Sequence, residues 1–157
     1  MTKGINRCID LIEAGHPIYY THAGELTYEH GRRQSQTWAD FEHAPFDVVG
    51  LLAFMRGLAD GGPTPDGYRM PTIIATLPSN CRTQAEVEAN AWQVRQVLSV
   101  GVHGILHTHA RDADAVRAFV DSCRYPFQTI RVDEDLDQSK RGAGGQDTPA
   151  DVWGISP

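Results

Sequence analysis

The sequence predicts an α/β protein in which parallel strands alternate with helices. Helical patterns with capping signals recur over 48–58, 83–98 and 112–123, and apolar segments suited to strands lie between them at 71–78 and 104–109. The segment 71–78 is apolar, rich in β-branched residues and bounded by prolines, which is typical of a strand covered on both faces. Alternation of this kind along a chain predicts a parallel sheet.

The composition is that of an ordinary globular protein with one domain. The chain has 157 residues, of which 41% are hydrophobic and 22% are charged. Its net charge of −6 argues against nucleic acids and anionic membranes as partners. No apolar run approaches the roughly 20 residues of a membrane span, and Asp10 and Glu13 interrupt any signal-peptide pattern. Three scattered cysteines, Cys8, Cys81 and Cys123, predict reduced thiols in a cytoplasm.

The N-terminal segment predicts one helix and one strand. Apolar residues at helical spacing indicate a short amphipathic helix over 5–12, which Gly15 and Pro17 end. A first strand is expected over 17–21, where an isoleucine and two tyrosines follow a proline. The sheet would therefore begin close to the N-terminus.

The segment that follows is mostly polar. Residues 22–31 predict a long loop or a frayed helix, and residues 32–38 predict one or two helical turns. A second strand is needed before the next helix, and only residues 37–41 are available for it. That stretch is short and carries a charge, so this strand is the weakest of the predicted set.

Each of the three later helices begins with a residue that can cap it. Asp47 precedes the helix over 48–58, Thr83 with Glu86 forms a capping box, and Asp112 precedes the last of the three. Gly101 is a suitable terminator for the second. Beyond these helices the periodicity fades, so 128–157 is expected to be irregular.

The loop before the helix over 48–58 holds the candidate catalytic residues. Asp40, Glu42 and His43 bring two carboxylates and an imidazole together between a predicted strand and a helix. In parallel α/β proteins such loops lie at the carboxyl ends of strands, where the chemistry is usually done. A histidine there can transfer a proton near neutral pH, and a neighbouring carboxylate can fix its tautomer.

This loop, Asp-Phe-Glu-His-Ala-Pro at 40–45, resembles the signature loop of the HpcH/HpaI aldolases, relatives of the citrate lyase β subunit. Residues 96–106 are similar to that family's helix, turn and fourth strand, and 113–126 is similar to its next helix with an Arg-Tyr-Pro end. The glycine-rich segment 141–146 resembles that of one subgroup. Together these stretches cover most of the chain from residue 37 to 146.

The resemblance implies a TIM barrel and a class II, metal-dependent pyruvate aldolase. Four predicted strands make half of an eight-stranded barrel, so residues 1–157 are expected to form one partial domain, the N-terminal half of a (βα)8 barrel. Residues 128–157 would lead into a missing C-terminal half, and Ser156-Pro157 is a helix-opening signature. A longer protein or a partner chain would then complete the barrel.

The resemblance also implies the reaction and its residues. The family cleaves 4-hydroxy-2-oxo acids into pyruvate and an aldehyde, or forms them, as a homo-oligomer. His43 would act as the base, with Glu42 and Asp40 orienting it, and Thr76 would contact the substrate carboxylate in place of the family's arginine. A divalent ion, Mg²⁺, Mn²⁺ or Co²⁺, would stabilise the enolate. Its ligands come from later strands, so no metal ligand is expected in this chain.

Two other functions remain open from the sequence. The chain can be a non-catalytic or incomplete barrel subunit that needs a partner. His107 and His109 lie two apart on a predicted strand, so both would point the same way, and a His-x-His pair of this kind can hold zinc in a hydrolase.

Overall fold

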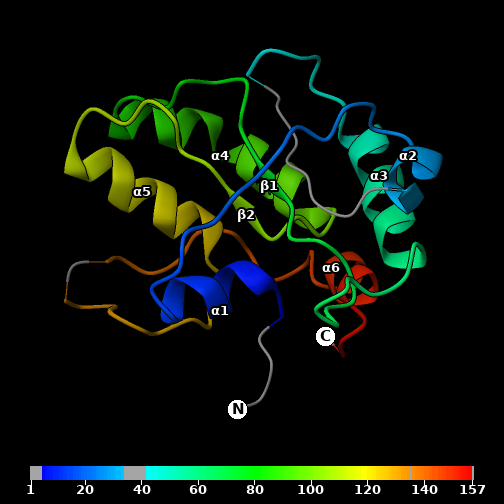
Figure 1. Ribbon diagram of the computed structural model, residues 1–157. Coiled ribbons are helices and arrows are strands. Elements are labelled where there is room, and N and C mark those ends of the chain that lie inside the picture. The colour runs from blue at the N-terminus through cyan, green and yellow to red at the C-terminus, as the bar shows by residue number, and fades with distance from the viewer. Residues whose placement is uncertain (1–4, 34–41, 135, 157) are drawn as a thin grey trace.

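The computed structural model describes residues 5–33, 42–134 and 136–156, drawn in Figure 1. In chain order their elements are α1 (Arg7–Glu13), α2 (Tyr28–Arg33), α3 (Val48–Asp60), β1 (Ile74–Ala75), α4 (Gln84–Ser99), β2 (Gly104–Ile105), α5 (Ala113–Cys123) and α6 (Asp147–Trp153). Among these residues, helices and strands alternate only in the middle of the chain, from α3 to α5.

The prediction of half a TIM barrel is wrong. In the part of the chain that the structure describes, the protein is mostly helical, and its sheet consists of two parallel strands of two residues each. The pairing joins Ile74 to Gly104 and Ala75 to Ile105. Residues 17–21 form no strand, and the predicted strand over 37–41 lies outside the described residues. The segment 128–157 contains helix α6, where irregular structure was expected.

A side chain limits the ladder at its first residue. The backbone N–H of Ile73 donates to Nδ1 of His103 at 3.0 Å, while the N–H of His103 donates to the Ile73 carbonyl at 2.8 Å. The imidazole nitrogen thus accepts the backbone N–H of Ile73, which in a longer ladder would donate to a backbone carbonyl of the neighbouring strand. An apolar run such as 71–78 indicates that the segment is buried, but it does not show how many of its residues pair with another strand. Here only Ile74 and Ala75 pair, so the sequence predicts a longer strand than the structure contains.

The three predicted capped helices are confirmed with their caps. The side chain of Asp47 accepts from the N–H of Gly50 at 2.8 Å, and that of Asp112 accepts from Ala115 at 2.7 Å. Thr83 caps α4, but the carboxylate of Glu86 accepts from Arg82 at 2.6 Å, one residue earlier than in a standard capping box. The N-terminal helix is also present, as α1.

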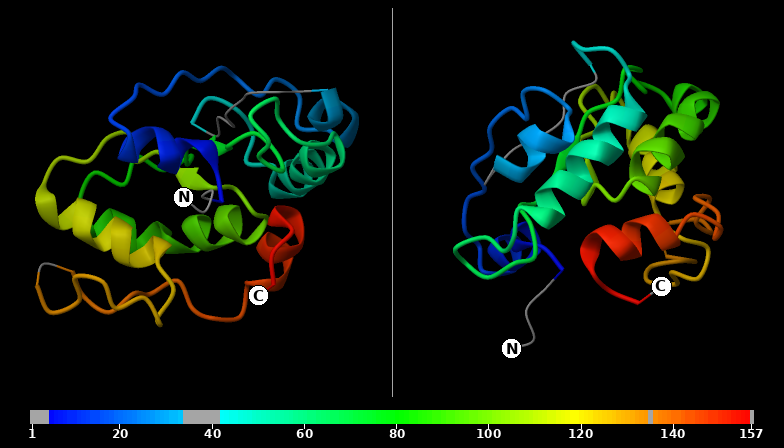
Figure 2. Two further views of the ribbon diagram at one scale, coloured as in Figure 1. Left: turned by 60° about the horizontal axis from the view of Figure 1, so that its bottom comes forward. Right: turned by 90° about the vertical axis from the view of Figure 1, so that its right-hand side faces the viewer.

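Helices and irregular segments cover the two strands on both faces. The right-hand view of Figure 2 shows α1 and the segment after it (blue) on one side of the molecule, and α4 (green) and α5 (yellow) on the other side. Ala75 and Ile73 are fully buried in the core, whereas Ile74 and Leu106 are partly exposed on the front face. The core takes most of its remaining side chains from three helices, Leu51, Phe54, Met55 and Leu58 of α3, Val87, Val94, Val97 and Leu98 of α4, and Ala115, Ala118 and Phe119 of α5.

Helices α2 and α3 approach each other at two glycines. A Cβ atom on Gly57 would lie 2.1 Å from the carbonyl oxygen of Tyr28, and one on Gly31 would lie 2.3 Å from that of Phe54. Only glycine fits where the backbones are this close. The Tyr28 hydroxyl adds a hydrogen bond to Asp60 at 2.8 Å.

Among the described residues, no helix combines the length and apolar character that crossing a membrane requires.

Helix α6 is fixed to the strands through two rings. The Trp153 indole N–H donates to the Gly101 carbonyl at 2.6 Å, and its ring stacks on His103 with centroids 5.7 Å apart. Burial lowers the pKa of His103 to about 4. The imidazole is therefore neutral near pH 7, which leaves Nδ1 free to accept the Ile73 N–H.

This arrangement predicts that acid destabilises the fold through His103. The pKa is lower in the folded chain than its ordinary 6.5, so the unfolded chain binds the proton first. The free energy of unfolding should be unaffected above about pH 6.5, decrease between 6.5 and about 4, and level off below that. A shift of this size corresponds to about 3 kcal/mol.

Urea unfolding across this pH range measures the effect, with His103→Asn as the comparison. The Asn oxygen can accept from Ile73 but does not titrate, so the variant should lose most of the decrease between pH 6.5 and 4. An equally steep decrease in the variant would show that other groups cause it.

Candidate functional site

Three loops meet at one edge of the strands and form the candidate site. They are 42–47 before α3, 76–82 after β1 and 106–112 after β2. Because β1 and β2 are parallel, their carboxyl ends lie at the same edge, so the loops that follow them are neighbours. The parallel pairing therefore brings polar and titratable side chains from separate parts of the chain close together.

A hydrogen bond joins the first and third of these loops. Nε2 of His109 lies 2.6 Å from Oε1 of Glu42, although the two residues are 67 apart in the sequence. The Glu42 side chain is 22% exposed and that of His109 is 45% exposed. The pair is accessible to a ligand and partly shielded from water, which suits proton transfer.

Thr76 holds the backbone of Glu42 in place. Its hydroxyl oxygen accepts the backbone N–H of Glu42 at 3.3 Å, and the residue is fully buried directly after β1. This bond ties the 42–47 loop to the end of the strand. The sequence predicts that Thr76 binds substrate, and the structure gives it a positioning contact with Glu42.

Further contacts hold the second and third loops together. His107 Nε2 is 2.7 Å from the Cys81 carbonyl oxygen, and its ring stacks on Phe119 of α5 at 4.4 Å between centroids. The N–H of Arg111 donates to the Arg82 carbonyl at 3.0 Å. These contacts fix the backbone on which His109 is carried, so the Glu42–His109 pair is built on a supported frame.

The pair can act as an oriented acid–base group. If Nε2 carries the proton that is shared with the Glu42 carboxylate, Nδ1 of His109 is the acceptor nitrogen of the ring. The carboxylate also stabilises the imidazolium that forms when Nδ1 takes up a proton. A carboxylate and an imidazole in this geometry therefore serve as a general base and then as a general acid.

The structure separates some residues that the sequence groups. His43 is exposed in the same loop as Glu42, and Asp40 lies outside the described residues. His107 and His109 do not converge, because one ring is stacked on Phe119 and the other contacts Glu42. The two histidines therefore do not form the zinc-binding pair that their spacing suggests.

The described residues do not fit a resident metal ion. Within 5–33, 42–134 and 136–156, no three His, Cys, Asp or Glu side chains are grouped so that they could hold one. The Glu42 and His109 side chains supply two such groups but are bonded to each other. We therefore derive no reaction step through a metal.

His109 contacts Glu42, although the sequence predicts it as a partner of His107. The signal for this contact is its place in the loop after β2, since β2 is parallel to β1 and the loops that follow the two strands lie at the same edge. Comparison with models of known protein families and with curated proteins finds no match for this chain. The geometry therefore carries the functional argument.

We predict that Thr76→Val weakens the loop that carries Glu42. The change keeps the side-chain volume but removes the acceptor of the Glu42 N–H, which should lower the free energy of unfolding by about 1 kcal/mol. Amide hydrogen exchange of residues 42–46 should also become faster. Both are measurable on the purified variant.

Thr72→Val is the matched control. Its hydroxyl oxygen is buried and has no hydrogen-bond partner among the described residues, so its removal should leave stability unchanged or raise it. Equal destabilisation by both variants would contradict the supporting role of Thr76.

Proposed function

We propose that the protein is a carbon–carbon lyase that cleaves 4-hydroxy-2-oxo acids into pyruvate and an aldehyde, or catalyses the reverse aldol addition. The observation that carries this proposal is the contact between Glu42 and His109, an acid–base pair at the carboxyl edge of two parallel strands. The resemblance of the Glu42–His43 loop to the HpcH/HpaI signature supports the same reaction class.

The reaction needs one proton acceptor and one proton donor. In the cleavage direction, Nδ1 of His109 removes the proton of the C4 hydroxyl, and the C3–C4 bond breaks to give an aldehyde and the enolate of pyruvate. The imidazolium, stabilised by Glu42, then returns a proton to C3 and yields pyruvate. His43 lies one residue from Glu42, and we propose that it contacts the aldehyde oxygen.

The family resemblance implies a divalent cation and a homo-oligomer, and both remain part of the proposal. Because the described residues do not provide a metal site, the cation would have to be held by other residues or by a partner chain. The assay therefore includes Mg²⁺, Mn²⁺ or Co²⁺ in separate reactions, together with a reaction that contains none.

The decisive experiment measures pyruvate released from a 4-hydroxy-2-oxo acid by the purified protein. His109→Ala and Glu42→Gln should each reduce kcat by about 10²- to 10⁴-fold, because each removes part of the acid–base pair. His43→Ala should raise KM or lower kcat by a smaller factor. The sizes of these effects rank the three residues.

His16→Ala is the matched control, since His16 is exposed after α1 and is not part of the three loops. Full activity in this variant shows that loss of a histidine alone is harmless. Unchanged turnover in His109→Ala and Glu42→Gln would remove the basis of the proposal, and absence of turnover in the unaltered protein under every metal condition would favour a non-catalytic role.

A further inference from the structure

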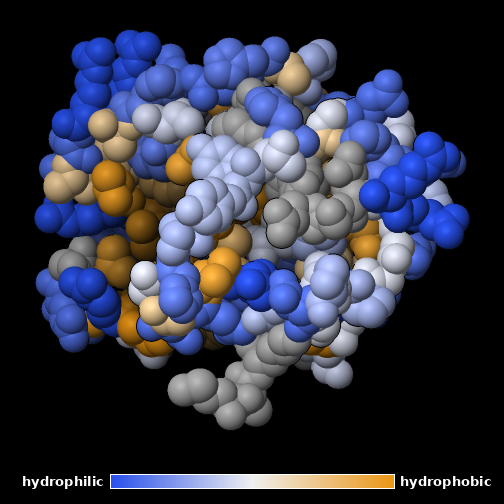
Figure 3. Space-filling model, in the orientation of Figure 1, coloured by the Kyte–Doolittle hydropathy of each residue, from blue (hydrophilic) through white to orange (hydrophobic). Residues whose placement is uncertain are grey.

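A large pocket lies on the front face of the strands and shares Leu106 with the loop 106–112 of the site. We call it the α1 pocket. It has a volume of about 470 Å³, within the range of small-molecule sites. Its walls are α1, the segment 17–20, the loop 64–72 and the partly exposed side chains of Ile74 and Leu106. Figure 3 shows apolar side chains in a recess on this face of the molecule.

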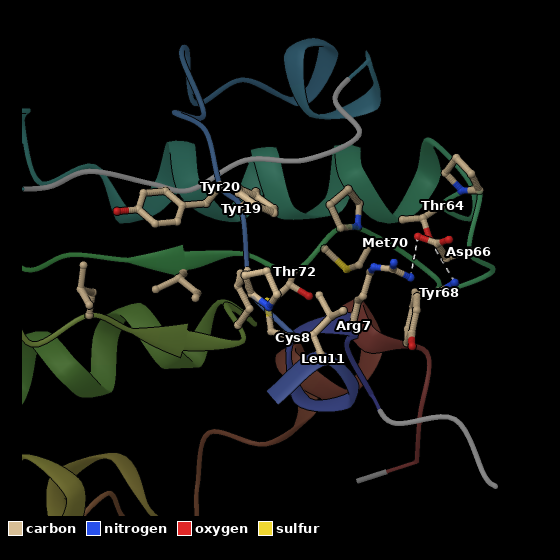
Figure 4. A pocket seen from close by; sticks show the side chains of 16 residues that line it. Arg7, Cys8, Leu11, Tyr19, Tyr20, Thr64, Asp66, Tyr68, Met70 and Thr72 are labelled. Atoms are coloured by element: carbon tan, nitrogen blue, oxygen red, sulfur yellow. Dashed lines mark hydrogen bonds and ion pairs between the residues drawn. The ribbon is translucent and has the colours of Figure 1, made fainter. Parts of the chain in front are cut away.

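The walls of the α1 pocket are mainly apolar and aromatic. Figure 4 shows the rings of Tyr19 and Tyr20 at one side of the pocket and the ring of Tyr68 at the other. Leu11 and Met70 lie between them. Tyr19 is 83% exposed, so it forms a rim and leaves the space open to solvent. Flat, open aromatic walls of this kind favour a ligand that carries an aromatic ring.

One end of the α1 pocket is acidic. Arg7 is paired with Asp66 at 2.8 Å, and the Tyr68 hydroxyl donates to Asp10. Among the residues that the structure describes, two carboxylates and one guanidinium give this end a negative balance, which would repel a carboxylate of the ligand. An anionic group of the ligand is therefore expected at the opposite end, beyond Ile74.

That opposite end leads toward the site. It is lined by Ile74 of β1 and by Leu106. Leu106 is the first residue of the loop 106–112 that carries His109, and Thr76, two residues after Ile74, accepts the N–H of Glu42. A long ligand in the α1 pocket would therefore extend toward the loops that carry the Glu42–His109 pair.

Thr72 supplies a polar group inside the α1 pocket. Its hydroxyl oxygen is buried and lacks a hydrogen-bond partner among the described residues. Figure 4 shows Thr72 among the side chains that line the pocket. A buried hydroxyl is stabilised when a ligand supplies the missing partner. A hydroxyl group on the aromatic ring of the ligand would do so.

We propose that the α1 pocket binds the aromatic part of the substrate, so that the protein acts on 2-oxo acids that carry an aromatic group. This inference rests on the proposed function for the position of the oxo-acid end. In the cleavage direction, 4-hydroxy-2-oxo-4-phenylbutanoate would lose its C3–C4 bond and give benzaldehyde and pyruvate, with all atoms retained in the two products.

The test uses the thiol of Cys8, which lines the α1 pocket. Burial raises the pKa of Cys81 and raises that of Cys123 to about 12, so at about pH 8 iodoacetamide should react mainly at Cys8. The alkylation rate is followed by peptide mass spectrometry with phenylpyruvate, 4-hydroxyphenylpyruvate or pyruvate present. No catalysis is needed for this readout.

Both aromatic acids should slow alkylation of Cys8, and pyruvate should not. The hydroxylated acid should bind about 3- to 10-fold more tightly, as expected for one added hydrogen bond, and Thr72→Val should abolish that difference. Absence of protection, or equal protection by pyruvate, would overturn the inference. Protection without aldol turnover would support ligand binding in the α1 pocket and refute the proposed reaction. Turnover without protection would support the reaction and refute binding in the α1 pocket.

Discussion

The two-residue parallel ladder between β1 and β2 is the constraint on which the rest of the structure depends. It fixes Ile74 beside Gly104 and Ala75 beside Ile105, and so sets the distance between the loops that follow. Because the strands are parallel, those loops emerge at one edge, together with the N-termini of α4 and α5. The Glu42–His109 contact and the tie between His107 and Cys81 both follow from this register.

The helices could be predicted from the sequence because their signals are local. Asp47, Thr83 and Asp112 each cap the helix that they precede, as their side chains and the apolar periodicity indicate. The sheet could not be predicted equally well, because an apolar run reports burial and not a pairing partner. His103 shows the physical cause, since its ring replaces a backbone group in the ladder, and nothing in its spacing announces this role.

The candidate site shows the same division between local and distant signals. Glu42 and His43 were identified from a short motif, whereas His109 joins them only through the pairing of strands 30 residues apart. His107 and His109, which the sequence pairs as zinc ligands, are separated for the same reason. Alternation along an ideal strand places His107 and His109 on one face, but the chain leaves the ladder after Ile105 and each ring finds a separate partner.

The glycine contact between α2 and α3 has a consequence for the entropy of the chain between them. Gly31 and Gly57 hold the two helices at backbone distance, so the ends of the connection from Arg33 to Val48 are fixed by helix packing. The entropic cost of closing this connection grows slowly with its length, by about 0.6 kcal/mol for each doubling. A longer connection ahead of Glu42 should therefore cost far less stability than any side chain at either glycine.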